Sequence, residues 1–596
     1  MLDHKKLFPY LLICLSVLAV YLPSFTGDFI LDDHPLIENN SYIKEWHSIA
    51  SYLSQEDGID ADSGNRHTGY YRPLVNPSYT ADYKIWGMNG PGFRITNLIL
   101  HLSACFALFI FYVRILNKRD TALCLALIFS LHPMVTETVS WVASRNNMLV
   151  TLFGILSFYF YIRAYRSERY FFYIMSILFF TLSVFSKEFG LMLLPIFFLY
   201  QRTLNTQKID ITKELREYIP YVLVGVLYFI FRQNVIGSFL SPKGLPDLLE
   251  KVYNVPYILL LNLRVIFLPY NLHCYTTNMP DRFFSTGTLG GIICFIPAMF
   301  LLWKFRKNRL LLFSALSFLM AIFPVAGIIP TSAPSIIAMR WLYFPAIFIL
   351  IVLAEPLNRL IRSKGRAAFF IIGCIILYLG INSWMLNRHL WHSEKIFYRQ
   401  EVFHFKNLYS YDGLARIYFD EGNFSLAEKC FLESFRLGVN RTINYIEYAV
   451  ILMERGEVKK ALSNLKNAEA CYPNKSEFGM ICNHRGLAYL KLKELDRAYE
   501  ELNKAVMFSP QAPLFLENLG VVCGEMGDHA KAIDSFKKAI RLQSKSENIY
   551  NNLALSYILN NECQKAVSLL DRKGFRENDR AKELLDRAKK CPDPDY

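Results

Sequence analysis

Apolar runs long enough to cross a lipid bilayer recur through the first two thirds of this 596-residue chain, and they constrain its fold more than any other feature. A helix needs about 20 apolar residues to cross the hydrocarbon core. With 53% hydrophobic and 15% aromatic residues, the composition is that of a membrane protein. We expect an all-α fold whose membrane part is a polytopic bundle of about eleven spans, over residues 7–24, 93–115, 121–133, 148–165, 169–186, 189–201, 218–236, 287–303, 310–326, 341–354 and 367–386.

Basic residues indicate the orientation of these spans. With a cytoplasmic N-terminus, the short loops rich in Lys and Arg fall on the cytoplasmic side, as the positive-inside rule requires; they are 114–119, 163–169, 202–217, 304–309 and 359–366. Residues 1–24 also suit a signal peptide, but they lack a small-residue cleavage site and further spans follow. The apolar segment 252–268 would invert every later loop if it spanned, so we expect a re-entrant or interfacial helix there.

Charged residues gather at the opposite, outer ends of the spans. An acidic pair, Asp32-Asp33, follows the first span and opens an outer loop over 25–91. Ionisable groups beside hydrocarbon are costly and mark functional sites, although each alone could be a solvated turn, a helix cap or a snorkelling side chain. Together they predict a shared polar cavity, and the other members are Arg72, His132, Glu137, Arg145, Lys187, Glu188 and Arg340.

This mixture of charges suits one kind of chemistry. Carboxylates beside guanidinium and ammonium groups can deprotonate a hydroxyl while cations stabilise an anionic leaving group. Arginine matches phosphate oxygens with two hydrogen bonds, and lysine supplies a mobile charge. A lipid-linked phosphosugar fits both requirements.

The motifs that carry these residues resemble a known family. They are Asp32-Asp33, Tyr71-Arg72-Pro73-Leu74, Gly92-Phe93 with Asn97-Leu98 and His101, His132-Pro133 with Glu137 and Ser144-Arg145, Ser186-Lys187-Glu188, and Arg340-Trp341-Leu342-Tyr343-Phe344-Pro345. In this order, and followed by repeats, they resemble the transmembrane and tetratricopeptide-repeat O-mannosyltransferases, within the GT-C superfamily of polyprenyl-phosphate-sugar glycosyltransferases. Met339 stands where the family usually has an acidic residue before the arginine, which leaves the ion pair of Arg340 open.

The resemblance implies an enzyme that transfers a sugar, with inversion, from a dolichyl or undecaprenyl phosphate to a protein Ser or Thr hydroxyl. It assigns Asp32 and Asp33 as the catalytic pair, one acting as base and the other orienting it, or both sharing Mg²⁺ or Mn²⁺; no organic cofactor is expected. The donor phosphate would be bound by Arg72 and Lys187, with Arg145 and Arg340 as further candidates. Supporting roles toward these cations, the sugar or the acceptor fall to His101, His132, Glu137 and Glu188.

The last third of the chain repeats. Small residues recur at Ala415, Ala449, Gly486, Gly520 and Ala554, at intervals of 34, 37, 34 and 34 residues. This spacing is typical of tetratricopeptide repeats, which stack into an α-solenoid. We expect a GT-C-like membrane domain over 1–390, a linker over 391–407, five repeats over 408–579, and a capping helix and tail over 580–596. The 37-residue interval predicts a longer turn around 471–476.

The partners follow from this organisation. The concave face of a solenoid on the outer side could hold the acceptor protein or another envelope protein. We expect a bacterial cytoplasmic membrane with periplasmic repeats, or alternatively an endoplasmic reticulum membrane with luminal repeats. No basic stripe with interleaved aromatic residues indicates nucleic acid. The rival functions are a membrane-anchored scaffold for envelope assembly, which would need only one span, and a transporter, which would need charges at the bilayer midplane.

Overall fold

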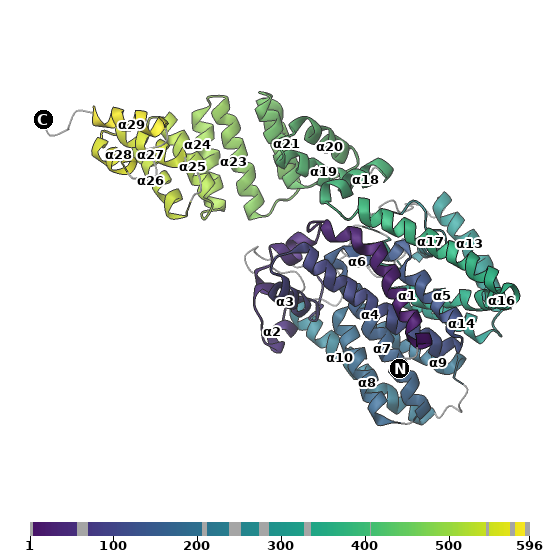
Figure 1. Ribbon diagram of the computed structural model, residues 1–596. Helices are drawn as coiled ribbons and strands as arrows, with labels where there is room; N and C mark the ends of the chain where they lie inside the picture. The colour runs from purple at the N-terminus through teal and green to yellow at the C-terminus, as the bar shows by residue number, and fades with distance from the viewer. Residues whose placement is uncertain are drawn as a thin grey trace. The chain divides into compact units, whose positions relative to one another are not determined.

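The computed structural model describes residues 4–55, 69–167, 169–205, 211–237, 252–272, 274, 285–326, 335, 337–405, 407–543, 548–571 and 579–590. The described residues form helices and no β-strand (Figure 1). The chain divides into two compact units, Met1–Asn407 and Leu408–Tyr596. The all-α expectation is therefore confirmed. Parts of the predicted outer loop (56–68) and of the tail (591–596) lie outside the described residues.

The first unit is a bundle of apolar helices. Its helices are α1 (His4–Tyr21), α2 (Ile49–Leu53), α3 (Val75–Trp86), α4 (Gly90–Leu116), α5 (Arg119–Ser130), α6 (Thr136–Ser140), α7 (Arg145–Ser167), α8 (Tyr170–Ser186), α9 (Leu193–Thr203), α10 (Ile211–Ile236), α12 (Val255–Phe267), α13 (Thr286–Lys304), α14 (Arg309–Ile322), α15 (Ala346–Ile349), α16 (Ala354–Lys364), α17 (Arg366–His389) and α18 (Glu394–Phe405). α4 packs against α5 and α7, and α7 lies along α8. Exposed apolar side chains on α1, α10, α13 and α17 suit contact with lipid.

The predicted count of about eleven spans is not confirmed. Among the described residues, six helices are long and apolar enough to cross a membrane, or seven if the bent pair Arg119–Ser130 and Pro133–Ser140 forms one span. The other predicted spans are shorter helices, such as the 11 residues of α9. Apolar sequence alone does not distinguish a spanning helix from a short helix buried inside the bundle. With 13 residues, α12 is also too short to cross alone, and its re-entrant placement stays a prediction.

The predicted linker is a helix. α18 occupies most of residues 391–407 and belongs to the first unit. Its Phe397 and the preceding Trp391 are fully buried in the core of that unit. The apolar anchors at these two positions explain why the segment packs against the bundle instead of extending from it.

The second unit consists of antiparallel helix pairs, as the repeat spacing predicts. The pairs are α19 (Leu408–Asp420) with α20 (Phe424–Arg436), α21 (Thr442–Glu454) with α22 (Val458–Glu469), α23 (Lys475–Lys491) with α24 (Leu495–Phe508), α25 (Pro513–Glu525) with α26 (His529–Arg541), and α27 (Asn548–Leu559) with α28 (Cys563–Leu570). The charged helix α29 (Asp579–Lys589) packs on the last pair and caps it. A Cβ at Gly486 or Gly520 would collide with Leu502 or Phe536, which is why the spacing marker must be small.

The longer turn predicted around 471–476 is wrong. α22 and α23 are joined by the five residues 470–474, and α23 is extended to 17 residues where α21 has 13. A capping box at Asn474 and Glu477 starts α23, because each side chain accepts a hydrogen bond from the backbone of the other residue. The longer interval therefore corresponds to a longer helix α23 and not to a longer turn.

Candidate active site

A cavity of about 230 Å³ lies among loops and helix ends of the first unit. It receives Asp32 from the loop after α1, Arg72 from the loop before α3, Lys187 from the end of α8 and Arg340 from the turn Met339–Leu342. The remaining lining residues are Pro35, Leu36, Tyr70, Trp141, Ala143, Ser144, Asn146, Asn147 and Trp341. Four of the ten predicted site residues, one carboxylate and three cations, thus meet at one cavity although they are separated by more than 300 positions in the sequence.

Asp32 is the acidic residue that faces this cavity. The preceding Leu31 has a left-handed backbone with φ of +54°, a conformation that costs a non-glycine residue about 1–3 kcal/mol and is enriched at functional sites. The side chain is open to the cavity. Enclosure by the protein raises the pKa of Asp32, while Arg340 and Arg72 oppose the rise. Asp32 is therefore a stronger base than an ordinary carboxylate, held between two cations.

Asp33 points away from the cavity into the protein. Its Oδ1 accepts a hydrogen bond of 2.7 Å from the backbone N–H of Ala143, and its Oδ2 accepts one of 3.2 Å from that of Ile30. Burial raises the pKa of Asp33 to about 7, although both backbone donors act against this shift. Because Ala143 lies in the cavity wall, Asp33 joins the loop of Asp32 to the opposite wall. Asp33 therefore fastens this loop and does not line the cavity.

A divalent cation shared by the two aspartates does not fit this arrangement. Asp33 is fully buried against the backbone N–H groups of Ile30 and Ala143, and of the two aspartates only Asp32 lines the cavity. Within the described part of the chain, no group of three or more His, Cys, Asp or Glu side chains could hold a metal ion.

The three cations of the cavity differ in how much of their charge is already paired. Arg340 forms an ion pair with the buried Glu137, whose other oxygen accepts the Arg340 backbone N–H at 3.0 Å. Arg72 lies 3.5 Å from the Glu188 carboxylate. Lys187 is 3% exposed and donates a 2.6 Å hydrogen bond to the neutral side chain of Asn147. The acidic partner that position 339 lacks is thus supplied to Arg340 by Glu137.

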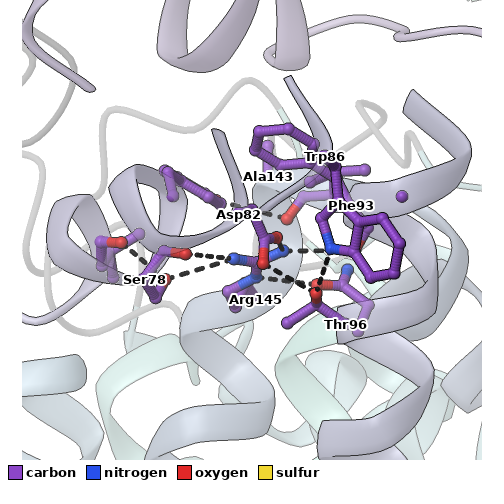
Figure 2. Close-up of polar contacts among 12 residues, drawn as sticks. Ser78, Asp82, Trp86, Phe93, Thr96, Ala143 and Arg145 are labelled. Carbon is purple, nitrogen blue, oxygen red and sulfur yellow. Dashed lines mark hydrogen bonds and ion pairs between the residues drawn. The ribbon is translucent and has the colours of Figure 1, made fainter. Parts of the chain in front are cut away.

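Arg145 does not line the cavity, and its predicted contact with the donor phosphate is not supported by this placement. Its guanidinium is fully buried and forms an ion pair with Asp82 of α3 (Figure 2). It also donates to the side chain of Asn97 at 2.8 Å and to the carbonyls of Ser78 and Phe93 at 3.0 and 3.2 Å. Asp82 in turn accepts from Thr96, so the cluster fastens α3 to α4 and α7.

The two predicted histidines also lie inside the bundle. His101 bridges the Tyr343 hydroxyl at 2.7 Å and the Ser130 carbonyl at 3.2 Å. His132 contacts the Ile266 carbonyl at 2.8 Å and accepts the Met134 N–H at 3.1 Å. Both rings are almost completely buried, and they connect helices rather than face the cavity.

Sequence reasoning missed the neutral wall of the cavity. Trp141, Ser144, Asn146 and Asn147 form the turn that starts α7, directly around the arginine that the motif emphasised. The side chain of Arg340 lies over the Trp141 ring at 4.8 Å. The signal was present in the run from 141 to 147, but a charge-based search passes over neutral hydrogen-bonding residues.

Comparison with known families defines the class of this membrane unit. Residues 73–236 match the family described as dolichyl-phosphate-mannose-protein mannosyltransferase, and residues 481–511 and 515–546 match tetratricopeptide repeats. The matched segment begins one residue after Arg72 and contains the cavity residues from Trp141 to Lys187. The chain is therefore similar to the mannosyltransferase family in its membrane unit and to tetratricopeptide repeats in its second unit, the combination that the sequence motifs resemble.

The relatives listed next are named protein O-mannosyl-transferases. The chain is 26% identical to the Caenorhabditis elegans protein O-mannosyl-transferase F38B6.6, over 56% of this chain and 49% of that protein. It is 20% identical to mouse protein O-mannosyl-transferase TMTC3, over 92% of this chain and 65% of that protein. The chain thus spans about half to two thirds of the length of these relatives. Among solved structures, MamA matches at 19% identity with a TM-score of 0.25, over 31% of this chain and 94% of that chain.

Proposed function

We propose that this chain is a membrane glycosyltransferase that moves a hexose, mannose in the first instance, from a polyprenyl phosphate donor to a Ser or Thr hydroxyl of a protein. The observation that carries the proposal is the cavity itself, which Asp32 lines together with Arg72, Lys187 and Arg340 in a bundle of apolar helices. The family match and the names of the relatives support the mannosyl group and the protein acceptor.

The geometry supports a single displacement. Asp32 accepts the proton of the acceptor hydroxyl while the oxygen of that hydroxyl attacks the anomeric carbon of the sugar. The bond between that carbon and the phosphate oxygen breaks, and the electron pair leaves with the polyprenyl phosphate. One displacement at the anomeric carbon inverts its configuration, so the product carries the anomer opposite to that of the donor.

Lys187 is the strongest candidate for binding the leaving phosphate. Its ammonium contacts a neutral amide and lies 4.2 Å over the Phe189 ring, whereas Arg72 and Arg340 each have a carboxylate within ion-pair distance. Among the described residues, no carboxylate lies within ion-pair distance of the Lys187 ammonium, so in this enclosed site it gains most from the second negative charge that develops on the phosphate as it leaves the sugar. Arg72 and Arg340 then contribute donors at the rim, with Arg340 14% exposed.

The remaining wall supports recognition of the sugar. Tyr70, Trp141, Ser144 and Asn146 supply aromatic faces, a hydroxyl and an amide. Such neutral groups match the C–H faces and hydroxyls of a hexose better than they match a phosphate. We therefore place the sugar toward the turn at 141–146 and the phosphate toward Lys187.

The second unit is proposed to bind the acceptor polypeptide or a partner protein, on the outer side of the membrane. Tetratricopeptide repeats present extended concave surfaces that suit this role. Cys563 is disulfide-bonded. Disulfides persist in oxidising compartments, which supports a periplasmic or luminal location for the repeats.

Purified protein in liposomes tests this function directly. We expect labelled mannose to pass from a synthetic polyprenyl phosphate mannose to a co-reconstituted Ser/Thr-rich protein, and not to a version in which every Ser and Thr is Ala. Nuclear magnetic resonance of the product should show the inverted anomer. The absence of transfer from mannosyl and glucosyl donors alike would contradict the enzyme and favour the scaffold.

A further inference from the structure

The loop that carries Asp32 is docked on the turn between α17 and α18. The backbone N–H of Asp28 donates a hydrogen bond to the His392 carbonyl at 3.2 Å. The Thr26 hydroxyl lies 3.4 Å from the Nδ1 of the same histidine. His34, on the other side of Asp32, lies 3.1 Å from the Glu394 carboxylate. The catalytic loop is therefore held on both sides of Asp32 by the segment 391–394, which we name the elbow.

The fit between loop and elbow leaves no room for a larger residue at position 27. A Cβ on Gly27 would lie 2.6 Å from the Trp391 carbonyl oxygen and 2.9 Å from that of His392. It would also lie 2.5 Å from the guanidinium of Arg94, which donates to the carbonyls of Gly27 and Asp28. Two of these atoms are backbone, so a side chain there would have to displace the loop.

His34 and Glu394 lie within ion-pair distance, 3.1 Å apart. Hydrogen bonding to Glu394 and Glu38 raises the pKa of His34 to about 9, against a partial desolvation that lowers it. The pair is partly exposed, with side-chain exposures of 36% and 26%. Its contribution to global stability should therefore be small, so removing it should alter the loop rather than unfold the protein.

We propose that the elbow is a positioning element for Asp32, acting through Gly27, Asp28 and His34, so that the rate of sugar transfer depends on how the turn before α18 is set. This inference rests on the proposed function, in which Asp32 is the base. Its physical reason is that proton abstraction requires the base within hydrogen-bond reach of the hydroxyl, and a misplacement of about 1 Å can cost about 100-fold in rate. Neither His34 nor the elbow lines the cavity, so they act through Asp32 and not on the ligand.

The test compares Glu394→Gln, Gly27→Ala and a control, Gly373→Ala, in full-length protein in liposomes. Gly373 lies on α17 with nothing within 4 Å of an added Cβ, so its variant should behave as wild type. We expect kcat to fall about 10-fold in Glu394→Gln and about 100-fold in Gly27→Ala, with the donor KM within about twofold of wild type. Hydrogen exchange at residues 27–33 should become faster in both variants and stay unchanged in the control.

The possible outcomes separate the two proposals. Suppose that the wild type transfers sugar. If kcat is then unchanged in both variants, or if KM and kcat change together in them, the elbow is not a positioning element, and the proposed function still stands. Unchanged exchange at residues 27–33 would also overturn it, because the loop would not be docked there. If the wild type transferred no sugar, the proposed function would fail, and with it any role of the elbow in setting a rate.

Discussion

Two arginine–carboxylate pairs in the first unit show how the same pair of groups can be enclosed by protein at one place and open to a cavity at another. Arg145 with Asp82 and Arg340 with Glu137 each join a guanidinium to a buried acid. Every nitrogen of Arg145 donates to protein and its side chain is 0% exposed, so no donor remains for a ligand. Arg340 is 14% exposed, lines the cavity and packs against Trp141. The surroundings of each arginine, not the residue type, decide which one can bind phosphate.

The largest expected difference between the two arginines is in their contribution to the free energy of unfolding. Arg145→Ala leaves Asp82 as an uncompensated buried charge, so it should reduce the free energy of unfolding by about 3–5 kcal/mol. Thermal unfolding in detergent measures the loss, and Asp82→Asn in the same chain should restore part of it. A folded Arg145→Ala protein with normal stability and weakened donor binding would instead make Arg145 a ligand residue.

The next largest effect is on donor affinity at the cavity. Lys187→Met should weaken binding of polyprenyl phosphate, the sugar-free product, by about 10- to 100-fold, because a charged hydrogen bond contributes about 1.5–3 kcal/mol. Arg340→Ala should do so less, since its charge is already shared with Glu137. Titration in liposomes measures both, with Lys187→Arg as the charge-preserving control. Equal affinity in wild type and Lys187→Met would remove Lys187 from the phosphate site.

A smaller effect is expected on the pH profile. Asp32 must be ionised to accept a proton, so kcat should fall as the pH drops through the pKa of Asp32, which its enclosure raises above that of an ordinary aspartate. Arg72 lowers this pKa, so Arg72→Gln should move the acidic limb to higher pH. Arg145 does not line the cavity, so Arg145→Lys should leave the acidic limb of the pH profile unchanged. A limb that moves to lower pH in Arg72→Gln would contradict Asp32 as the titrating base.

The smallest effect concerns the neutral wall. Asn146→Ala should raise the donor KM by about 2- to 10-fold through one lost neutral hydrogen bond and should leave the affinity for sugar-free polyprenyl phosphate unchanged. Competition between mannosyl and glucosyl donors would report whether the same position contributes to sugar choice. Equal weakening for donor and for sugar-free phosphate would place Asn146 at the phosphate instead.

The sequence could predict which loops meet, because span order and basic loops put Asp32, Arg72, Lys187 and Arg340 on one side of the membrane. It could also predict the repeats, since Gly486 and Gly520 mark positions with no space for a side chain. The orientation of individual side chains could not be predicted from the sequence. Asp32 lines the cavity, whereas the adjacent Asp33 is buried against the backbone of Ile30 and Ala143.

Other differences arose because the partners of a residue are set by tertiary packing. Nothing in the spacing of Asp82 indicates that it would bury Arg145, and the acid that Arg340 needs comes from Glu137, 203 residues earlier. The predicted number of spans is not confirmed because apolar segments of 11 to 14 residues, such as α9 and α14, satisfy a hydropathy pattern without the length to cross a bilayer alone.

The most direct measurement of the central claim compares Asp32→Asn with Asp33→Asn for sugar transfer, unfolding and binding of polyprenyl phosphate. We predict that Asp32→Asn keeps wild-type stability and phosphate affinity but loses transfer by at least about 100-fold, whereas Asp33→Asn chiefly lowers stability. Transfer retained by a folded Asp32→Asn protein would contradict the account.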